Sequence, residues 1–200
     1  NAWVDEARQI LQDEPAANML TLRGFAAYPN LPQLQDVYKL RAAAFAVYPM
    51  YRGIAQLVGM DPVPSGESFK DSVDALKERW DEGYTFFFLH YKPTDAAGED
   101  GDFDRKVAAI EEFDAFLPEV QDLQPDVLVV TGDHSTPALM AAHSWHPVPF
   151  LLAGKSVRVV DTGEGFDEIH CARGALGVFY AKDALTLAMA HAGKLVKYGA

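Results

Sequence analysis

Residues that can bind metal ions follow an apolar segment in the middle of the chain. The run VLVV at 127–130 has the composition of a buried strand, and Asp133 and His134 come soon after it. His143 follows a few residues later, ahead of a second apolar run. Carboxylate and imidazole groups that follow strands in an open α/β sheet are typical ligands of divalent metal ions. The pattern therefore indicates a metal site suited to phosphate chemistry.

A second group of polar residues follows an aromatic segment. YTFFFLHY at 84–91 is continuously apolar and bounded by Gly and Pro, which is typical of a strand. The sequence after it contains Lys92, Asp95 and Glu99. The acidic residues around Glu99 usually indicate a solvated loop, and only their place after a strand favours a functional role.

The two segments together resemble the cofactor-independent phosphoglycerate mutases, most closely their archaeal-type branch, which are alkaline-phosphatase-like metalloenzymes. TGDHSTP followed by AHSWHPVPF resembles the family's metal-binding segment, and HYKPTDAAGEDGD resembles H-x-K-x-T-D-x-A-G-H-D-G. The resemblance extends through LTLRG and YPMYRGIAQLVGM to the carboxyl-terminal KYGA. It implies a single metalloenzyme domain over residues 1–200, equivalent to the carboxyl-terminal half of the family. An amino-terminal half of the same polypeptide would be missing, which leaves the alkaline-phosphatase-like fold incomplete.

The resemblance also implies two metal sites. Asp95, Glu99 and His143 would form the first, while Asp133 and His134 would supply half of the second. The missing half would provide an aspartate and the nucleophilic serine. Glu99 stands where the family has a histidine, and a carboxylate there favours harder ions such as Mn²⁺ or Mg²⁺ over Zn²⁺.

The implied reaction is the interconversion of 3-phosphoglycerate and 2-phosphoglycerate, a step of glycolysis and gluconeogenesis, through a phosphoserine. Two divalent metal ions would activate the serine and neutralise the transferring phosphoryl group. Lys92 would take part in catalysis, and Lys92 and Arg23 would bind the phosphate or carboxylate of this small phosphorylated acid. Without the serine, the 200 residues alone are expected to be inactive.

Two other functions remain open. The first is a metal-dependent phosphatase-like hydrolase, in which water rather than glycerate resolves the phosphoserine. The second is a non-catalytic, metal-binding fragment.

Structural interpretations of the same residues also remain. Ser135 or Thr136, followed by Pro137, has the pattern of a helix amino-terminus, and we expect a helix to begin there. Cys171 lacks a recognisable histidine partner, so a small buried hydrophobic residue is the better interpretation. The remaining histidines after residue 140 are expected to lie outside the site: His146, His170 and His191.

The composition excludes several kinds of partner. The net charge is −12 and there is no basic cluster, which argues against nucleic acid and against an anionic membrane surface. The longest apolar runs are far too short to span a bilayer. The single cysteine forms no internal disulfide, so a reducing, cytoplasmic location is expected.

The alternation of strands and helices predicts an α/β fold with a mostly parallel sheet and helices on both faces. Expected strands are 20–24, 84–91, 127–130 and 149–154, with 41–48 as strand or helix; expected helices are 4–11, 51–60, 71–82, 103–120 and 182–193. The metal-binding residues should converge at one edge of the sheet, with the Asp95 and Asp133 carboxylates within about 10 Å of each other.

Overall fold

The computed structural model describes residues 2–22, 24–158 and 165–195, and its contacts divide the chain into Asn1–Pro32 and Gln33–Ala200. The first part contains helix α1 (Ala2–Ile10), as predicted. The strand expected at 20–24 is wrong, because residues 20–22 are exposed and belong to no strand. A strand needs a neighbouring strand for its backbone hydrogen bonds. Arg23 lies outside the described residues.

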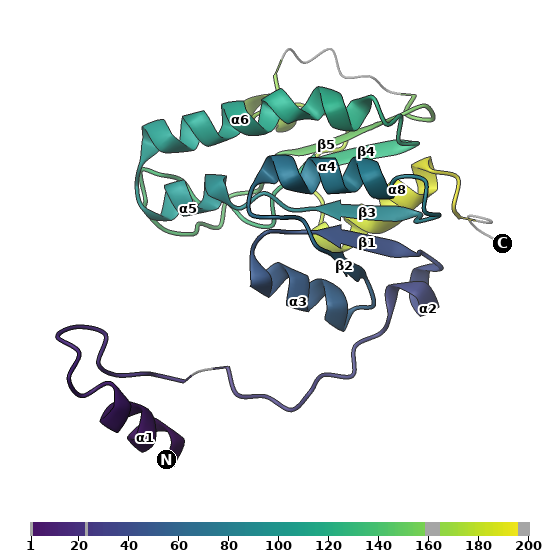
Figure 1. Cartoon of the computed structure of the whole chain (residues 1–200). Coiled ribbons are helices and arrows are strands. Elements are labelled where there is room, and N and C mark those ends of the chain that lie inside the picture. The colour runs from purple at the N-terminus through teal and green to yellow at the C-terminus, as the bar shows by residue number, and fades with distance from the viewer. Residues whose placement is uncertain (1, 23, 159–164, 196–200) are drawn as a thin grey trace. The chain divides into compact units, whose positions relative to one another are not determined.

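A parallel three-stranded sheet forms the centre of the second part (Figure 1). Its strands are β1 (Ala42–Phe45), β2 (Asp61–Val63) and β3 (Phe86–Leu89), in the order β2-β1-β3. All four residues of β1 are buried, as expected of a central parallel strand that is covered on both faces. The core around Phe45 includes Leu76 and the ring of Phe87, which stacks on Phe45 at 6.4 Å between ring centroids.

A separate two-stranded sheet differs from the mostly parallel arrangement that the sequence predicts. β4 (Val127–Thr131) and β5 (Phe150–Gly154) pair antiparallel, with Val127 opposite Gly154. Residues 132–149 between them contain no helix, and a parallel pair would need a long crossover connection. The antiparallel pairing therefore brings the start of β5 next to the end of β4, where Phe150 lies opposite Thr131. Residues 132–149 connect the two strands at that end.

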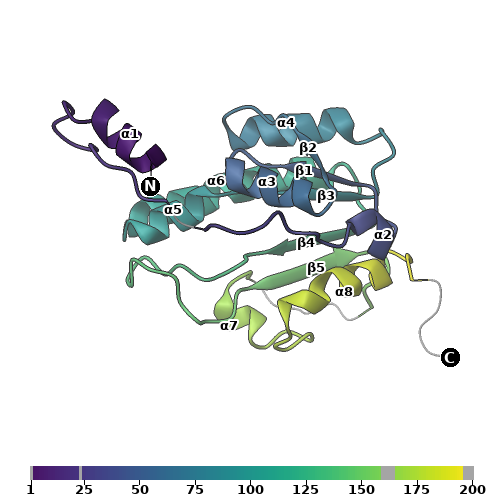
Figure 2. The same ribbon diagram turned by 90° about the horizontal axis from the view of Figure 1, so that it is seen from below.

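The helices of the second part lie on opposite sides of the strands. Figure 2 shows α4 (Phe69–Arg79) on one side and α7 (Glu168–Cys171) and α8 (Ala184–His191) on the opposite side. The other helical elements are α2 (Leu34–Tyr38), α3 (Pro49–Leu57), α5 (Pro93–Glu99), α6 (Phe103–Gln121) and a 3₁₀ turn (Ala181–Asp183). The predicted α/β class with helices on both faces is thus confirmed.

Side-chain caps set where two of these helices begin. Ser68 accepts a hydrogen bond from the Asp71 backbone N–H, and the Asp71 carboxylate accepts one from the Ser68 N–H. This capping box starts α4 at Phe69, earlier than the predicted residue 71. Asp102 similarly caps α6 by accepting from the Arg105 N–H.

The helix expected at Pro137 is absent, because residues 132–145 form turns, bends and an isolated bridge. The Thr136 hydroxyl donates to the Asp95 carboxylate, at 2.5 Å, and caps no helix. Within the described part of the chain, no helix has the length and apolar character needed to cross a membrane.

Candidate metal centre

Three segments meet where β3 and β4 end. Asp95 lies in the first turn of α5, which begins at Pro93 shortly after β3. Asp133 and His134 follow β4 directly. His143 lies on the returning segment, where the Ser144 backbone N–H donates to the Ser135 carbonyl at 2.9 Å. This bridge brings the two halves of the 132–149 segment together.

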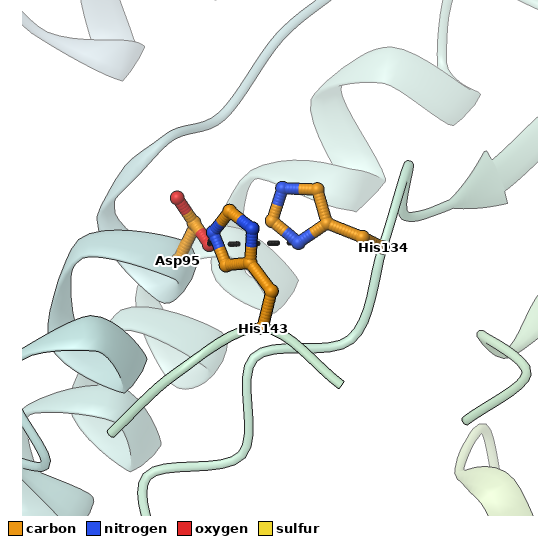
Figure 3. Close-up of side chains that lie close together, drawn as sticks. All are labelled: Asp95, His134 and His143. Carbon is orange, nitrogen blue, oxygen red and sulfur yellow. Dashed lines mark ion pairs between the residues drawn. The ribbon is translucent and has the colours of Figure 1, made fainter. Parts of the chain in front are cut away.

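Asp95, His134 and His143 form a triad in which one ligand atom from each residue lies within 4.8 Å of the others. Figure 3 shows both imidazoles directed toward the Asp95 carboxylate. The distance to Asp95 Oδ1 is 3.7 Å from His134 Nδ1 and 3.6 Å from His143 Nε2. The two rings are 3.9 Å apart between centroids. Two imidazole nitrogens and a carboxylate oxygen are a donor set suited to a divalent metal.

Hydrogen bonds hold Asp95 in its ionised form. Its side chain is only 15% exposed, and it accepts hydrogen bonds from Lys92 and Thr136. Burial alone would raise the pKa of Asp95, but these two hydrogen bonds outweigh burial, so its pKa lies below the ordinary value. The hydrogen bond to Asp95 raises the pKa of Lys92, which keeps this ammonium group charged. Asp95 is therefore available as an anionic ligand at neutral pH.

Glu99 lies beside the triad. Its Oε1 is 3.2 Å from His143 Nε2, and its Oε2 is 3.9 Å from Lys92 Nζ. Its side chain is half exposed, at 48%. The carboxylate thus contacts one member of the triad, and its role as a ligand stays a prediction.

Asp133 lies on the other side of the His134 ring. Asp133 Oδ2 is 3.6 Å from His134 Nε2 and accepts a hydrogen bond of 2.8 Å from the Tyr51 hydroxyl. Because the Asp95 and Asp133 carboxylates contact opposite nitrogens of one ring, they are closer together than the roughly 10 Å limit set by a shared two-metal cluster. Burial, followed by the hydrogen bond to Asp133, raises the pKa of Tyr51 to about 12.

A close approach of backbones keeps α5 against the His134 segment. A Cβ atom added at Gly98 would lie 2.2 Å from the Thr136 carbonyl oxygen. The Lys106 ammonium donates to the same carbonyl at 2.5 Å. Glycine is therefore required at position 98 for Asp95 to reach Thr136 and His134.

Sequence reasoning missed two residues of this site. Tyr51 lies in a segment used only for the family resemblance, and Thr136 was expected only as a helix cap. No spacing rule points to Tyr51, because its partner Asp133 is 82 residues away.

The other histidines have different partners. His146 Nδ1 is 2.8 Å from the Ser144 hydroxyl, His170 Nδ1 is 2.7 Å from Asp167, and His191 contacts Ser156. Cys171 is only partly buried, so it is not the fully buried residue that the sequence suggests.

An open groove begins at Asp133 and His134 and continues along β5 to Phe179, with a volume of about 1590 Å³ and mostly apolar walls. Small-molecule pockets typically measure roughly 300–1,000 Å³. The groove is larger than a three-carbon acid requires, so its size does not define a substrate.

The chain is similar to a known family of proteins over most of its length. A family model described as the Metalloenzyme superfamily matches residues 6–191. A Thermotoga petrophila protein named "Probable 2,3-bisphosphoglycerate-independent phosphoglycerate mutase" is 51% identical over 200 residues, which cover 100% of this chain and 49% of that protein. A Thermus thermophilus protein of the same name is 50% identical over 203 residues, covering 100% and 50%. The chain thus spans about half the length of the curated relatives it matches.

Solved structures show a similar fold. A Pyrococcus horikoshii protein is 33% identical, with a TM-score of 0.78 over 89% of this chain and 57% of that protein. A cofactor-independent phosphoglycerate mutase from Thermoplasma acidophilum is 21% identical, with a TM-score of 0.63 over 96% of this chain and 51% of the other. At this identity the second likeness concerns the fold alone.

Proposed function

We propose that this chain, which belongs to the Metalloenzyme superfamily, provides one half of the two-metal active site of a phosphoglycerate mutase. The reaction would move phosphate between the 3- and 2-positions of glycerate through a phosphoserine. The names of the relatives from Thermotoga petrophila and Thermus thermophilus support this assignment. The serine and the remaining ligands would come from the part of the relatives that this chain does not match.

The observation that carries the proposal is the convergence of Asp95, His134 and His143, with ligand atoms within 4.8 Å of one another. Asp95 follows β3, His134 follows β4, and His143 lies on the segment that leads from β4 to the antiparallel strand β5. Ionised Asp95, which accepts hydrogen bonds from Lys92 and Thr136, is typical of a ligand held by outer-shell contacts. The donor set therefore fits a divalent ion.

Each residue of the chain has a proposed role. The resemblance implies that His134 binds the second ion with Asp133, but His134 Nδ1 faces Asp95 Oδ1 at 3.7 Å, so we assign His134 to the first ion. Asp95, His134 and His143 would then hold that ion, with Glu99 as a further ligand, and Asp133 would bind a second ion. Bound Mn²⁺ or Mg²⁺ would supply positive charge that activates the serine and offsets charge on the phosphoryl group.

Lys92 pairs with Asp95 in this structure. A metal ion bound to Asp95 would replace Lys92 as its cationic partner, and Lys92 would then bind the phosphate or carboxylate of the substrate. Lys92 Nζ also lies 5.7 Å from the Tyr48 ring centroid, which limits the space that its ammonium group can sample. Arg23 remains a proposed substrate contact from the sequence alone.

A graft experiment tests the proposal. The chain would replace the matching 200 residues of the Thermotoga petrophila relative, and conversion of 3- to 2-phosphoglycerate would be measured with Mn²⁺. We expect turnover, and we expect Asp95→Asn to lower kcat/KM by more than the roughly 10–100-fold that loss of an outer-shell contact costs. Glu78→Gln, an exposed change on α4, is the control and should retain activity.

The products distinguish the other functions. Release of free phosphate without 2-phosphoglycerate would assign a hydrolase. A graft that is folded, binds Mn²⁺ and turns over neither reaction would contradict the enzymatic proposal and leave a non-catalytic metal-binding fragment.

A further inference from the structure

Tyr51 connects the two sheets next to the metal centre. It lies in the first turn of α3, the helix that follows β1, and its hydroxyl donates to Asp133 beyond the end of β4. The oxygen–oxygen distance is 2.8 Å, which is typical of a hydroxyl that donates to a carboxylate. A residue of the helix that follows β1 thus contacts a carboxylate that follows the antiparallel strand β4.

The ring of Tyr51 is held in place before it reaches Asp133. It stacks on the His90 imidazole, with 3.6 Å between ring centroids and an angle of 25° between the planes. His90 is itself fixed, because its backbone N–H donates to the Phe45 carbonyl at 2.9 Å as a continuation of the β1–β3 pairing. The Tyr51 hydroxyl is therefore positioned by the parallel sheet.

Asp133 needs such a support. Its side chain is 59% exposed and follows the end of β4 on a segment without helix or strand. Oδ1 accepts from the backbone N–H of the next residue, His134, at 3.2 Å, and Oδ2 accepts from Tyr51. An ionised carboxylate has about four lone-pair positions, so both oxygens keep acceptor capacity for a metal ion.

We propose that Tyr51 is a positioning residue, whose hydroxyl orients the Asp133 carboxylate for metal binding. The inference rests on the proposed function only in taking Asp133 as part of the metal centre. Contacts of this kind, in which a second residue orients a ligating carboxylate, typically change metal affinity by about 10–100-fold when they are removed.

The test is a double-mutant cycle in the Mn²⁺ affinity of the second site, measured by isothermal titration on the grafted protein, in which the remaining ligands of that site are present. Tyr51→Phe removes the hydroxyl and keeps the ring that stacks on His90. We expect it to weaken Mn²⁺ binding about tenfold, and to have no effect when Asp133 is already Asn. Tyr84→Phe is the matched control, because it removes a hydroxyl that hydrogen-bonds the Asp61 carboxylate before β3, away from the metal centre, and it should bind Mn²⁺ like the wild type.

Two results would overturn the role of Tyr51: unchanged affinity in Tyr51→Phe, or an equal loss in the wild-type and Asp133→Asn backgrounds. The second result would mean that the hydroxyl acts on something other than Asp133. Circular dichroism establishes that each variant is folded. Asp133→Asn alone separates the two failures, because unchanged Mn²⁺ affinity in that variant would remove Asp133 from the metal centre and contradict the proposed function. A loss of affinity in Asp133→Asn without a loss in Tyr51→Phe would contradict only the role of Tyr51.

Discussion

At the scale of single residues, Asp95 has the largest number of polar partners in the site. Lys92 and Thr136 donate to it, and one nitrogen each of His134 and His143 lies within 3.7 Å of Oδ1. Lys92 neutralises the carboxylate in the way that a cation would. A bound metal ion must therefore compete with this ammonium group, which reduces the net gain from metal binding.

Replacement of Glu99 tests whether it is a ligand. We expect Glu99→His to bind Zn²⁺ roughly tenfold more tightly, because imidazole suits Zn²⁺ better than a carboxylate does. Asp100→His is the matched control, since Asp100 pairs with Arg105 at 2.5 Å and should leave Zn²⁺ affinity unchanged. Equal Zn²⁺ affinities of Glu99→His and the wild type would show that Glu99 is not a ligand.

At the scale of elements, the packing of α5 against the His134 segment depends on Gly98. Gly98→Ala should lower the free energy of unfolding by about 1–3 kcal/mol through overpacking, because the new Cβ meets a backbone carbonyl. It should also weaken Mn²⁺ binding. Urea denaturation and metal titration measure the two effects.

Gly53→Ala on α3 is the control for Gly98→Ala, because a Cβ there has nothing within 4 Å. Alanine favours a helix by about 1 kcal/mol relative to glycine, so this control should be neutral or stabilising. Equal stabilities of the two alanine variants would argue against the close contact.

The cap of α4 predicts a pH-dependent stability. The hydrogen bonds from Ser68, and one from the Glu67 N–H, lower the pKa of Asp71. Its contribution to stability is therefore present above the unfolded pKa of about 3.9 and is lost as pH falls through the lower folded pKa.

We expect Asp71→Asn to be less stable than the wild type at pH 7, with the difference shrinking toward pH 2 in urea denaturation. Glu78→Gln, on the same helix but outside the cap, is the control. A difference that stays constant over this range would contradict the role of the Asp71 carboxylate.

Elements with a continuous local pattern could be predicted from the sequence. The helix expected at 103–120 is found as Phe103–Gln121, and the aromatic segment at 84–91 contains β3. The direction of β5 could not be predicted, because an apolar run does not say which way it pairs. The Tyr51–Asp133 contact depends on tertiary packing between distant residues, which no local spacing encodes.

At the scale of the whole molecule, the chain covers only about half the length of its Thermotoga petrophila relative. We expect the 200 residues alone to show no conversion of 3- to 2-phosphoglycerate, because the proposed serine lies in the unmatched part. Nucleophile and ligands act as a unit, so loss of the nucleophile costs orders of magnitude in rate. The grafted protein is the positive control, and measurable turnover by the isolated chain would contradict the expectation.

The triad takes Asp95 from beyond β3 and its histidines from the β4–β5 side, and these strands belong to separately hydrogen-bonded sheets. A cation held by all three residues would add a cross-link between two ladders that share no backbone hydrogen bonds between their strands. Local opening of one ladder would then require release of the ion. The backbone amides of both ladders would therefore gain protection from hydrogen exchange when the ion binds. Hydrogen exchange should slow in β4 and β5 when Mn²⁺ is added, and it should not slow in Asp95→Asn.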